Sequence, residues 1–258
     1  MITSASNGRV KGVIHLSKKT KLRNEKKLFI IEGIKLFLEA PKERIREIYI
    51  SESFYRENKD IDYFKKLDYE IVADDIFEKM SDTITPQGIL CVVEQFEYKL
   101  EEIIDSDNSH IIILENIQDP GNLGTIIRTS EGAGVTGVII TKGSADIYQP
   151  KVIRSTMGSI YRVPFVYVED IKEAIYNMKS KNIKVYAAHL EGENEYFDTD
   201  ISKSSAILIG NEGNGIKDET LKLVDEYIRI PMMGEVESLN AAVAASLLMY
   251  EVLRQRRK

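Results

Sequence analysis

Residues 206–215 read Ala-Ile-Leu-Ile-Gly-Asn-Glu-Gly-Asn-Gly, a short apolar run followed directly by a glycine-rich loop. An apolar run of this length, bounded by glycine, is typical of a buried strand. Strand-like runs of this kind alternate with helix-like periodic stretches along the chain. We therefore predict an α/β fold with a mainly parallel sheet. In such a sheet, the loop at the carboxyl end of a strand is the usual place for a ligand.

The second half of the chain, from residue 110, carries this pattern most regularly. Further strands are predicted at residues 111–114, 138–141, 163–168, 184–188 and 227–230. A turn at residues 119–122 precedes a helix predicted from Leu123 to Ala133. The last helix should begin at Ser238, because its hydroxyl can accept a hydrogen bond from free backbone amides, and should run to the C-terminus. Small side chains over residues 241–248 permit close packing against another helix or another subunit.

The first 97 residues form a smaller αβ pattern. Strands are predicted at residues 28–31, 45–50, 70–73 and 89–96, and helices at residues 34–40 and 74–80. Residues 97–109 contain five acidic side chains and little apolar content after Ile104. Such a composition favours a domain boundary. We predict an N-terminal domain over residues 1–97, a linker over 98–109 and a second domain over 110–258.

Charge is distributed unevenly along the chain. The 35 lysines and arginines against 41 acidic residues give a net charge of −6, which argues against a protein that coats nucleic acid by bulk charge. Residues 1–30 nevertheless hold eight basic side chains and one acidic one, a local charge of +7. This segment is either a phosphate-contacting surface or an ordinary solvated lysine face. Our candidates for nucleic-acid contacts are Lys18, Lys19, Arg23 and Lys26.

Simple counts disfavour several other classes of protein. The single Cys91 rules out an internal disulfide, and three scattered histidines offer no spacing typical of a zinc site. No apolar run approaches the ~20 residues of a membrane helix, and the N-terminus lacks the apolar core of a signal peptide. We therefore expect a cytoplasmic protein that uses no metal and contacts no membrane.

Residues 132–137 match the dinucleotide-binding pattern G-x-G-x-x-G. That loop must follow a strand and open a helix, so that phosphates meet the free amides of the helix. Here a predicted helix precedes the glycines and a predicted strand follows them. We therefore interpret these glycines as a helix end and a turn, and a nicotinamide-dependent enzyme is disfavoured.

Three segments of the second domain combine loops with polar side chains. The loop at 210–215 follows a strand but lacks the lysine of a phosphate-binding loop, and Glu212 would repel phosphate. Residues 230–240 join a strand end to a helix start through a proline turn. Residues 119–128 place Arg128 on the second turn of a predicted helix. Taken singly, the three are explained as a turn, a helix cap and a surface arginine.

The order of these segments is more informative than any one of them. Along the chain they read N-x-G-x-x-x-R at 122–128, G-N-E-G-x-G at 210–215 and I-P-M-x-G-x-x-x-S-L-N at 230–240. Over residues 110–258 this arrangement resembles the SpoU/TrmH family of RNA 2′-O-ribose methyltransferases, in the SPOUT superfamily. The N-terminal domain is similar in layout to the ribosomal-protein-like, RNA-substrate-binding domain that precedes the catalytic domain in many bacterial rRNA members.

The resemblance implies a parallel α/β sheet whose C-terminal segment forms a deep trefoil knot, which general topology rules would not predict. It also implies that S-adenosylmethionine lies among the knotted loops, with its adenine held mainly by backbone groups. Carried over by motif position, the implied cofactor-binding residues are Gly210, Asn211, Ile230, Met232 and Leu239.

The resemblance further implies a metal-free transfer of a methyl group to a ribose 2′-hydroxyl. The catalytic-site residues implied by motif position are Arg128, Asn122, Glu212, Asn240 and Ser238. Arg128 would act as the base or as a clamp for phosphate and the developing alkoxide. We favour the clamp, because a guanidinium rarely releases its proton. Ser238 is equally well explained as a helix cap.

Partners are implied in the same way. In this family the arginine of one subunit often completes the pocket of the other, so a homodimer through the second domain is expected. The substrate is expected to be structured RNA, and the additional N-terminal domain favours 23S rRNA over tRNA. A tRNA 2′-O-methyltransferase and a catalytically inactive rRNA-binding or assembly protein are the alternatives.

Overall fold

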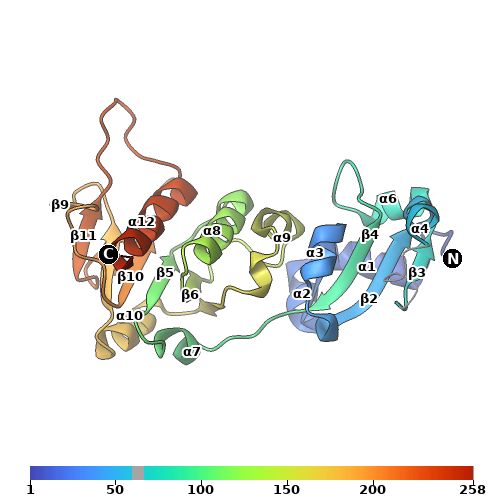
Figure 1. Ribbon diagram of the computed structural model, residues 1–258, viewed down its shortest axis with the longest axis horizontal. Coiled ribbons are helices and arrows are strands. Elements are labelled where there is room, and N and C mark those ends of the chain that lie inside the picture. The colour runs from blue at the N-terminus through green and yellow to red at the C-terminus, as the bar shows by residue number, and fades with distance from the viewer. Residues whose placement is uncertain (60–66, 258) are drawn as a thin grey trace. The chain divides into compact units, whose positions relative to one another are not determined.

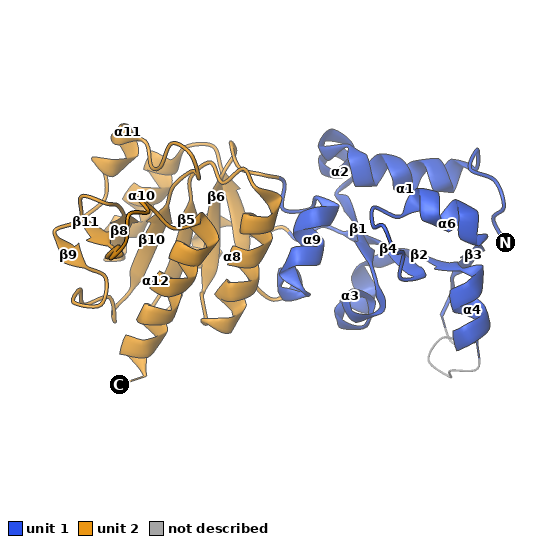
Figure 2. Ribbon diagram, turned by 90° about the horizontal axis from the view of Figure 1, so that it is seen from above, with its two compact units in different colours: residues 1–96, 146–161 blue, residues 97–145, 162–258 orange. Residues whose placement is uncertain are grey.

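The computed structural model describes residues 1–59 and 67–257 (Figure 1). The chain divides into two compact units, which Figure 2 colours separately. Unit 1 contains residues 1–96 and 146–161, and unit 2 contains residues 97–145 and 162–258. Within the described ranges, no helix has the length and hydropathy of a membrane span.

Unit 2 is built on a parallel sheet with the strand order β7-β6-β5-β10-β8-β11-β9. The strands are β5 (His110–Leu114), β6 (Gly137–Thr141), β7 (Phe165–Val168), β8 (Lys184–Ala188), β9 (Asn194–Glu195), β10 (Ser205–Ile209) and β11 (Glu226–Arg229). The helices are α7 (Leu100–Ile104), α8 (Pro120–Gly132), α10 (Ile171–Ser180), α11 (Asp218–Leu221) and α12 (Ala241–Arg256). The parallel sheet predicted for this half of the chain is confirmed.

Helices cover both faces of this sheet. Every residue of β5, β6 and β10 is buried, as isoleucine-rich and valine-rich strands are when both faces are covered. Ala206 and Leu208 of β10 share one core cluster with α7 and α10. Because side chains alternate along a strand, Ile207 and Ile209 point to the other face, where α8 and α12 lie (Figure 1). The carboxyl ends of β8, β10 and β11 consequently meet at one edge.

Unit 1 contains a smaller sheet in the order β1-β4-β2-β3. Its strands are β1 (Leu28–Glu32), β2 (Ile45–Ser51), β3 (Glu70–Val72) and β4 (Ile89–Glu94). Its helices are α1 (Gly8–Lys18), α2 (Thr20–Lys26), α3 (Ile34–Glu39), α4 (Glu52–Asn58), α6 (Asp74–Met80) and α9 (Pro150–Thr156), with short 3-10 turns at η1 (Lys42–Arg44) and η2 (Ser159–Tyr161). Strand β4 runs antiparallel to both β1 and β2, and only β2 and β3 are parallel. The mainly parallel pairing predicted for the chain therefore holds for unit 2, whereas the sheet of unit 1 is mixed.

The basic N-terminal segment forms helices α1 and α2, which the sequence pattern did not predict. Lysines and arginines between the apolar positions obscure a buried stripe of Val10, Val13 and Leu16. These three residues pack in one core cluster with side chains of β1, β4 and α6. A surface of basic side chains therefore lies on helices whose other side belongs to the core.

Three boundaries differ from the predicted ones. The predicted linker contains α7, whose Ile103 and Ile104 are buried in the core of unit 2. Residues 146–161, which we placed in the second domain, belong to unit 1. Helix α8 begins at Pro120 rather than Leu123, because Asp119 accepts a hydrogen bond from the Asn122 amide and proline suits the first helical position.

Candidate functional site

A cavity of about 410 Å³ lies at the carboxyl ends of β8, β10 and β11. Its walls come from residues 188–190, from the loop at 209–216 and from the segment that leads from β11 into α12. This volume is in the range of small-molecule sites. All five predicted cofactor-binding residues line the cavity, namely Gly210, Asn211, Ile230, Met232 and Leu239. Glu212 and Ser238 also line it.

The loop after β10 is folded tightly around Asn211. The backbone amides of Asn211 and Gly215 each donate to the other residue's carbonyl at 3.0 Å. The side-chain Oδ1 of Asn211 accepts from the amides of Gly213 and Asn214 at 3.0 and 2.9 Å. A Cβ atom on Gly210 would lie 2.4 Å from the carbonyl carbon of Gly215, so this position admits no side chain. The glycine is required by the close approach of backbone to backbone.

Three of the predicted catalytic residues form one hydrogen-bonded chain. Asn122 donates from Nδ2 to Oε1 of Glu212 at 3.0 Å, and Asn240 donates from Nδ2 to Oδ1 of Asn122 at 2.9 Å. The backbone amides of Gln118 and Asp119 also donate to the Glu212 carboxylate, both at 3.2 Å. The start of α8, the loop after β10 and the start of α12 are thereby joined.

The protonation of Glu212 follows from these contacts. Partial burial acts to raise the pKa of its carboxyl. Hydrogen bonds from Asn122 and from the nearby backbone amides outweigh that effect and hold the pKa below its ordinary value of 4.5. Glu212 is consequently a carboxylate near neutral pH, which suits it to accept several hydrogen bonds but not to donate one.

The helix cap predicted at Ser238 is wrong, because Asn240 caps α12. Oδ1 of Asn240 accepts from the amides of Ala242 and Val243 at 2.9 and 3.3 Å, and the helix begins at Ala241. Ser238 is exposed, and no residue in the described part of the chain forms a hydrogen bond with its hydroxyl. Its hydroxyl therefore remains available at the cavity wall.

Arg128 is exposed on the third turn of α8, one turn later than predicted, because the helix begins at Pro120. It is not among the residues that line the cavity of its own chain. Among residues 1–59 and 67–257, no side chain or backbone group forms a hydrogen bond or ion pair with its guanidinium. Arg128 shares the exposed side of α8 with Thr125.

Both halves of the chain match known protein families. The profile of the SpoU rRNA Methylase family matches residues 109–250, and that of the MRM3-like substrate binding domain matches residues 7–91. The chain belongs to the SpoU rRNA methylase family. The resemblance inferred from the three ordered motifs is thus confirmed.

Similar family members are known in sequence and in structure. The 23S rRNA (guanosine(2553)-2′-O)-methyltransferase RlmP of Bacillus subtilis is 34% identical over 253 residues, which is 97% of this chain and 98% of that protein. The AdoMet-bound rRNA methyltransferase of Sinorhizobium meliloti has a TM-score of 0.86 at 28% identity and covers 98% of this chain and 97% of its own. The SpoU methyltransferase AviRb of Streptomyces viridochromogenes, in complex with AdoMet, has a TM-score of 0.86 at 27% identity, covering 97% of this chain and 98% of its own.

One of the four predicted RNA contacts in unit 1 of this SpoU protein is wrong. The Arg23 side chain is only 2% exposed and binds Asp146 through Nε and Nη2 at 2.9 and 2.6 Å. Its Nη1 donates to the carbonyls of Leu16 and Ser17. Arg23 therefore holds helix α2 inside unit 1 and cannot contact RNA.

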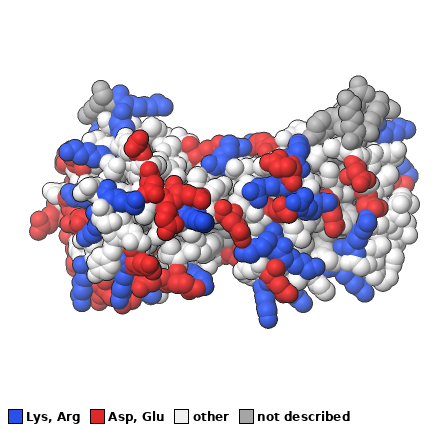
Figure 3. All heavy atoms as spheres, turned by 90° about the horizontal axis from the view of Figure 1, so that it is seen from below, with Lys and Arg blue, Asp and Glu red and all other residues white. Residues whose placement is uncertain are grey.

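The other three residues, Lys18, Lys19 and Lys26, are exposed. Their ammonium groups form no ion pair with described residues. Basic and acidic side chains are interspersed over the face of the protein shown in Figure 3. The lysines of α1 and α2 are a local basic feature of a chain whose net charge is −6.

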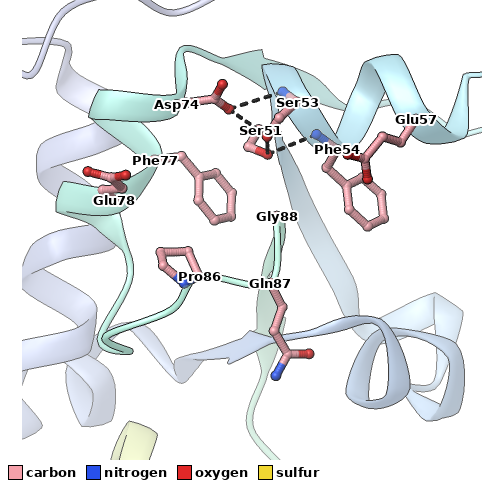
Figure 4. Close-up of a pocket in the computed structure, with 10 residues that line it drawn as sticks. All are labelled: Ser51, Ser53, Phe54, Glu57, Asp74, Phe77, Glu78, Pro86, Gln87 and Gly88. Atoms are coloured by element: carbon pink, nitrogen blue, oxygen red, sulfur yellow. Dashed lines mark hydrogen bonds between the residues drawn. The ribbon is translucent and has the colours of Figure 1, made fainter.

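Unit 1 also contains an open cavity of about 230 Å³ at the end of β2, lined by residues of α4, of α6 and of the segment before β4 (Figure 4). The Phe77 ring points into it beside Pro86. Asp74 accepts hydrogen bonds from the Ser53 amide and hydroxyl, which hold the pKa of its carboxyl below 3.8. Because the Asp74 carboxylate already binds Ser53 and none of the described residues that line this cavity is basic, we assign the cavity no ligand.

Sequence reasoning missed two residues next to the family's motif loops. His189 follows β8 directly and lines the unit 2 cavity. Asn116 follows β5 with a φ of 55°, and its carbonyl accepts a hydrogen bond from Nδ2 of Asn211 at 2.7 Å. Both positions lie just beyond predicted strands, and that location was the signal that could have identified them.

Proposed function

We propose that this SpoU protein methylates a ribose 2′-hydroxyl of 23S rRNA, with S-adenosylmethionine as methyl donor. One observation carries the proposal: a chain whose five predicted cofactor-binding residues line one cavity is 34% identical, over nearly its full length, to a 23S rRNA 2′-O-methyltransferase. The trefoil knot and a cytoplasmic location are part of the same proposal.

The cavity of unit 2 suits S-adenosylmethionine. Apolar side chains of Ile209, Ile228 and Ile230 line it and can pack against an adenine ring. The glycine at 210 brings loop backbone to the cavity wall, where its polar groups can bind a purine edge. No lysine or arginine is among the described lining residues, so a positively charged sulfur is not repelled and a phosphate-rich cofactor lacks a counter-charge.

The residues around the cavity have different roles in the reaction. S-adenosylmethionine, when bound, supplies an activated methyl group on a positively charged sulfur. The isoleucine walls exclude water, and the chain of Asn122, Glu212 and Asn240 holds the surrounding loops in place. Arg128 binds the RNA phosphate through its planar guanidinium and stabilises the negative charge that develops on the 2′-oxygen.

A second copy of the chain completes the site in this proposal. On α12, Val243 and Tyr250 are 48% and 50% exposed, and an apolar surface hollow of α12 also includes Thr125 of α8. Arg128 shares the exposed side of α8 with Thr125. A partner subunit packed on this apolar surface would cover it and receive Arg128 at its own cavity.

Unit 1 would bind the RNA substrate. The match to a substrate-binding domain over residues 7–91 supports this role, and the exposed Lys18, Lys19 and Lys26 supply phosphate contacts. Replacing all three by alanine should weaken RNA binding and lower the salt dependence of the binding constant, by about 0.7 to 0.9 in log–log slope for each phosphate that is no longer neutralised. An unchanged slope would show that these lysines do not contact RNA phosphates.

The substrate can be tested with purified protein and methyl-labelled S-adenosylmethionine. Unmodified 23S rRNA and tRNA transcripts are offered in parallel, and binding of S-adenosylhomocysteine is measured by calorimetry. We expect label in 23S rRNA only. Label in tRNA only would support the tRNA enzyme, and cofactor binding without label in either RNA would support an inactive rRNA-binding protein.

Sharing of the site between subunits can be tested by complementation. The variants Arg128→Ala and Gly210→Ala should each be inactive, since one lacks the arginine and the other the cofactor loop. Mixed and refolded together, they should regain part of the activity, because a heterodimer contains one intact cavity opposite one intact arginine. A mixture that forms heterodimers by sedimentation but stays inactive would refute the shared site.

A further inference from the structure

His189 occupies a central position among the loops of the unit 2 cavity. It follows β8, which lies between β10 and β11, the strands that lead into the two motif loops. Its backbone amide donates to the Ile228 carbonyl at 3.0 Å, so its place beside β11 is fixed. The side chain is half-buried and lines the cavity.

The contacts of the imidazole define which ring nitrogen can donate. Nδ1 accepts a hydrogen bond from the Glu191 amide at 3.3 Å. A neutral imidazole that accepts at Nδ1 carries its proton at Nε2, so Nε2 is a donor. No residue within the described ranges accepts a hydrogen bond from Nε2.

The Tyr227 ring packs against the imidazole and helps to fix its orientation. The ring centroids are 5.3 Å apart, and the Tyr227 hydroxyl donates to the Leu221 carbonyl at 3.2 Å. The donor at Nε2 is therefore preorganised by two neighbours rather than carried on a free side chain. A preorganised donor at a cavity wall is suited to an acceptor on the bound molecule.

The charges around the cavity indicate which acceptor this is. Two acidic residues, Glu212 and Glu237, line the cavity, and none of the described lining residues is lysine or arginine. The sulfonium and amino groups of S-adenosylmethionine are positively charged and suit these surroundings. The carboxylate of S-adenosylmethionine is negatively charged and is unfavourable next to these glutamates unless neutral groups donate hydrogen bonds to it.

We infer that His189 donates a hydrogen bond from Nε2 to the carboxylate of the methionine part of S-adenosylmethionine. This inference rests on the proposed function. It makes His189 a cofactor-binding residue that selects for the amino-acid end of the cofactor, while the motif loops hold the adenine end.

Calorimetry with two cofactor analogues tests this assignment. S-adenosylhomocysteine carries the amino-acid carboxylate, whereas methylthioadenosine has the same adenosine but lacks the amino-acid part. For His189→Ala we expect affinity for S-adenosylhomocysteine to fall by about tenfold or more, as for loss of a hydrogen bond to a charged group. Affinity for methylthioadenosine should change by less than about twofold. His189→Gln, which retains an amide donor, should recover part of the affinity.

The controls separate this inference from the proposed function. His15→Ala removes an exposed histidine from α1 in unit 1 and should change neither affinity. Equal losses for both analogues, or no loss for either, in His189→Ala and His189→Gln would overturn the carboxylate assignment. A wild-type protein that binds neither analogue would instead overturn the proposed function. Thermal unfolding midpoints identify any variant that fails to fold, and His189→Gln then carries the test.

Discussion

Asn122 donates a 3.0 Å hydrogen bond to Glu212 across a separation of ninety residues in sequence. The same Asn122 accepts a 2.9 Å hydrogen bond from Asn240 through its side-chain oxygen. Both polar atoms of Asn122 are thereby used within the protein. Asn122 consequently joins the start of α8 to the loop after β10 and to the start of α12.

Removing this side chain should loosen the loops without unfolding unit 2. Asn122→Ala deletes two hydrogen bonds, each worth about 1 kcal/mol, at an incompletely buried site. We expect the affinity for S-adenosylhomocysteine to fall by up to about tenfold in calorimetry, with a small change in the unfolding midpoint. Lys222→Ala, on the surface beyond α11, serves as control. An unchanged affinity for S-adenosylhomocysteine would mean that the hydrogen-bonded chain does not order the cavity.

The glycines of the loop after β10 should differ sharply in their tolerance of a methyl group. A Cβ on Gly210 would meet the carbonyl carbon of Gly215 at 2.4 Å, whereas a Cβ on Gly213 has its nearest neighbour, Oδ1 of Asn211, at 3.6 Å. Gly210→Ala should therefore abolish cofactor binding, and Gly213→Ala should retain it within a few-fold. Equal affinity of the two variants in calorimetry would contradict the described loop.

The buried pair of Arg23 and Asp146 should be important for stability rather than for RNA binding. Arg23→Ala leaves Asp146 without its partner in a largely buried position, and loss of one partner of a buried pair costs roughly 3 kcal/mol. Lys19→Ala, a neighbouring exposed position, should change the free energy of unfolding by less than about 0.5 kcal/mol. Chemical denaturation measures both. Similar stabilities would contradict the buried role of Arg23.

His110 should make the protein less stable in mild acid. It is 1% exposed, its Nε2 has no hydrogen-bond partner among the described residues, and burial, with a smaller effect of Arg256, lowers its pKa from 6.5 to about 3. At pH values between 3 and 6.5, His110 therefore binds a proton in the unfolded chain but not in the folded protein. Stability is complete above pH 6.5 and falls as the pH is lowered towards 3.

Between pH 7 and pH 5 this effect amounts to about 2 kcal/mol. Denaturant titrations of the wild type and of His110→Leu at both pH values measure it. The variant should lose less stability on acidification, whereas His15→Leu, at an exposed histidine, should behave as the wild type does. Equal losses of stability on acidification in all three proteins would show that His110 does not cause the effect.

The sequence predicted most of unit 2 because its signals are local. The strand β8 begins and ends where its apolar pattern predicts, and residues of the loops at 210–215 and 230–240 line one cavity. The N-cap of α12 was harder to predict, because Ser238 and Asn240 are both good N-cap residues. Only the folded structure shows which of them caps the helix. The predicted helix end at Lys258 lies outside the described residues.

Unit 1 shows what a local reading of sequence cannot provide. The basic residues of α1 and α2 give a strong polar signal, and the pattern contains no sign that Arg23 among them is buried against Asp146. That ion pair joins residues 123 positions apart. The position of β4 between β1 and β2 likewise depends on pairing between distant segments, so the mixed sheet could not be derived from periodicity.

The most direct test of the account is to map alkali-resistant linkages in 23S rRNA, because a methylated 2′-oxygen cannot attack the adjacent phosphate. RNA is compared from cells that lack the protein and from cells that regain the wild type or Arg128→Ala. We predict one resistant linkage that disappears without the protein, returns with the wild type and does not return with Arg128→Ala. A pattern of linkages that is the same in all these cells would contradict the account.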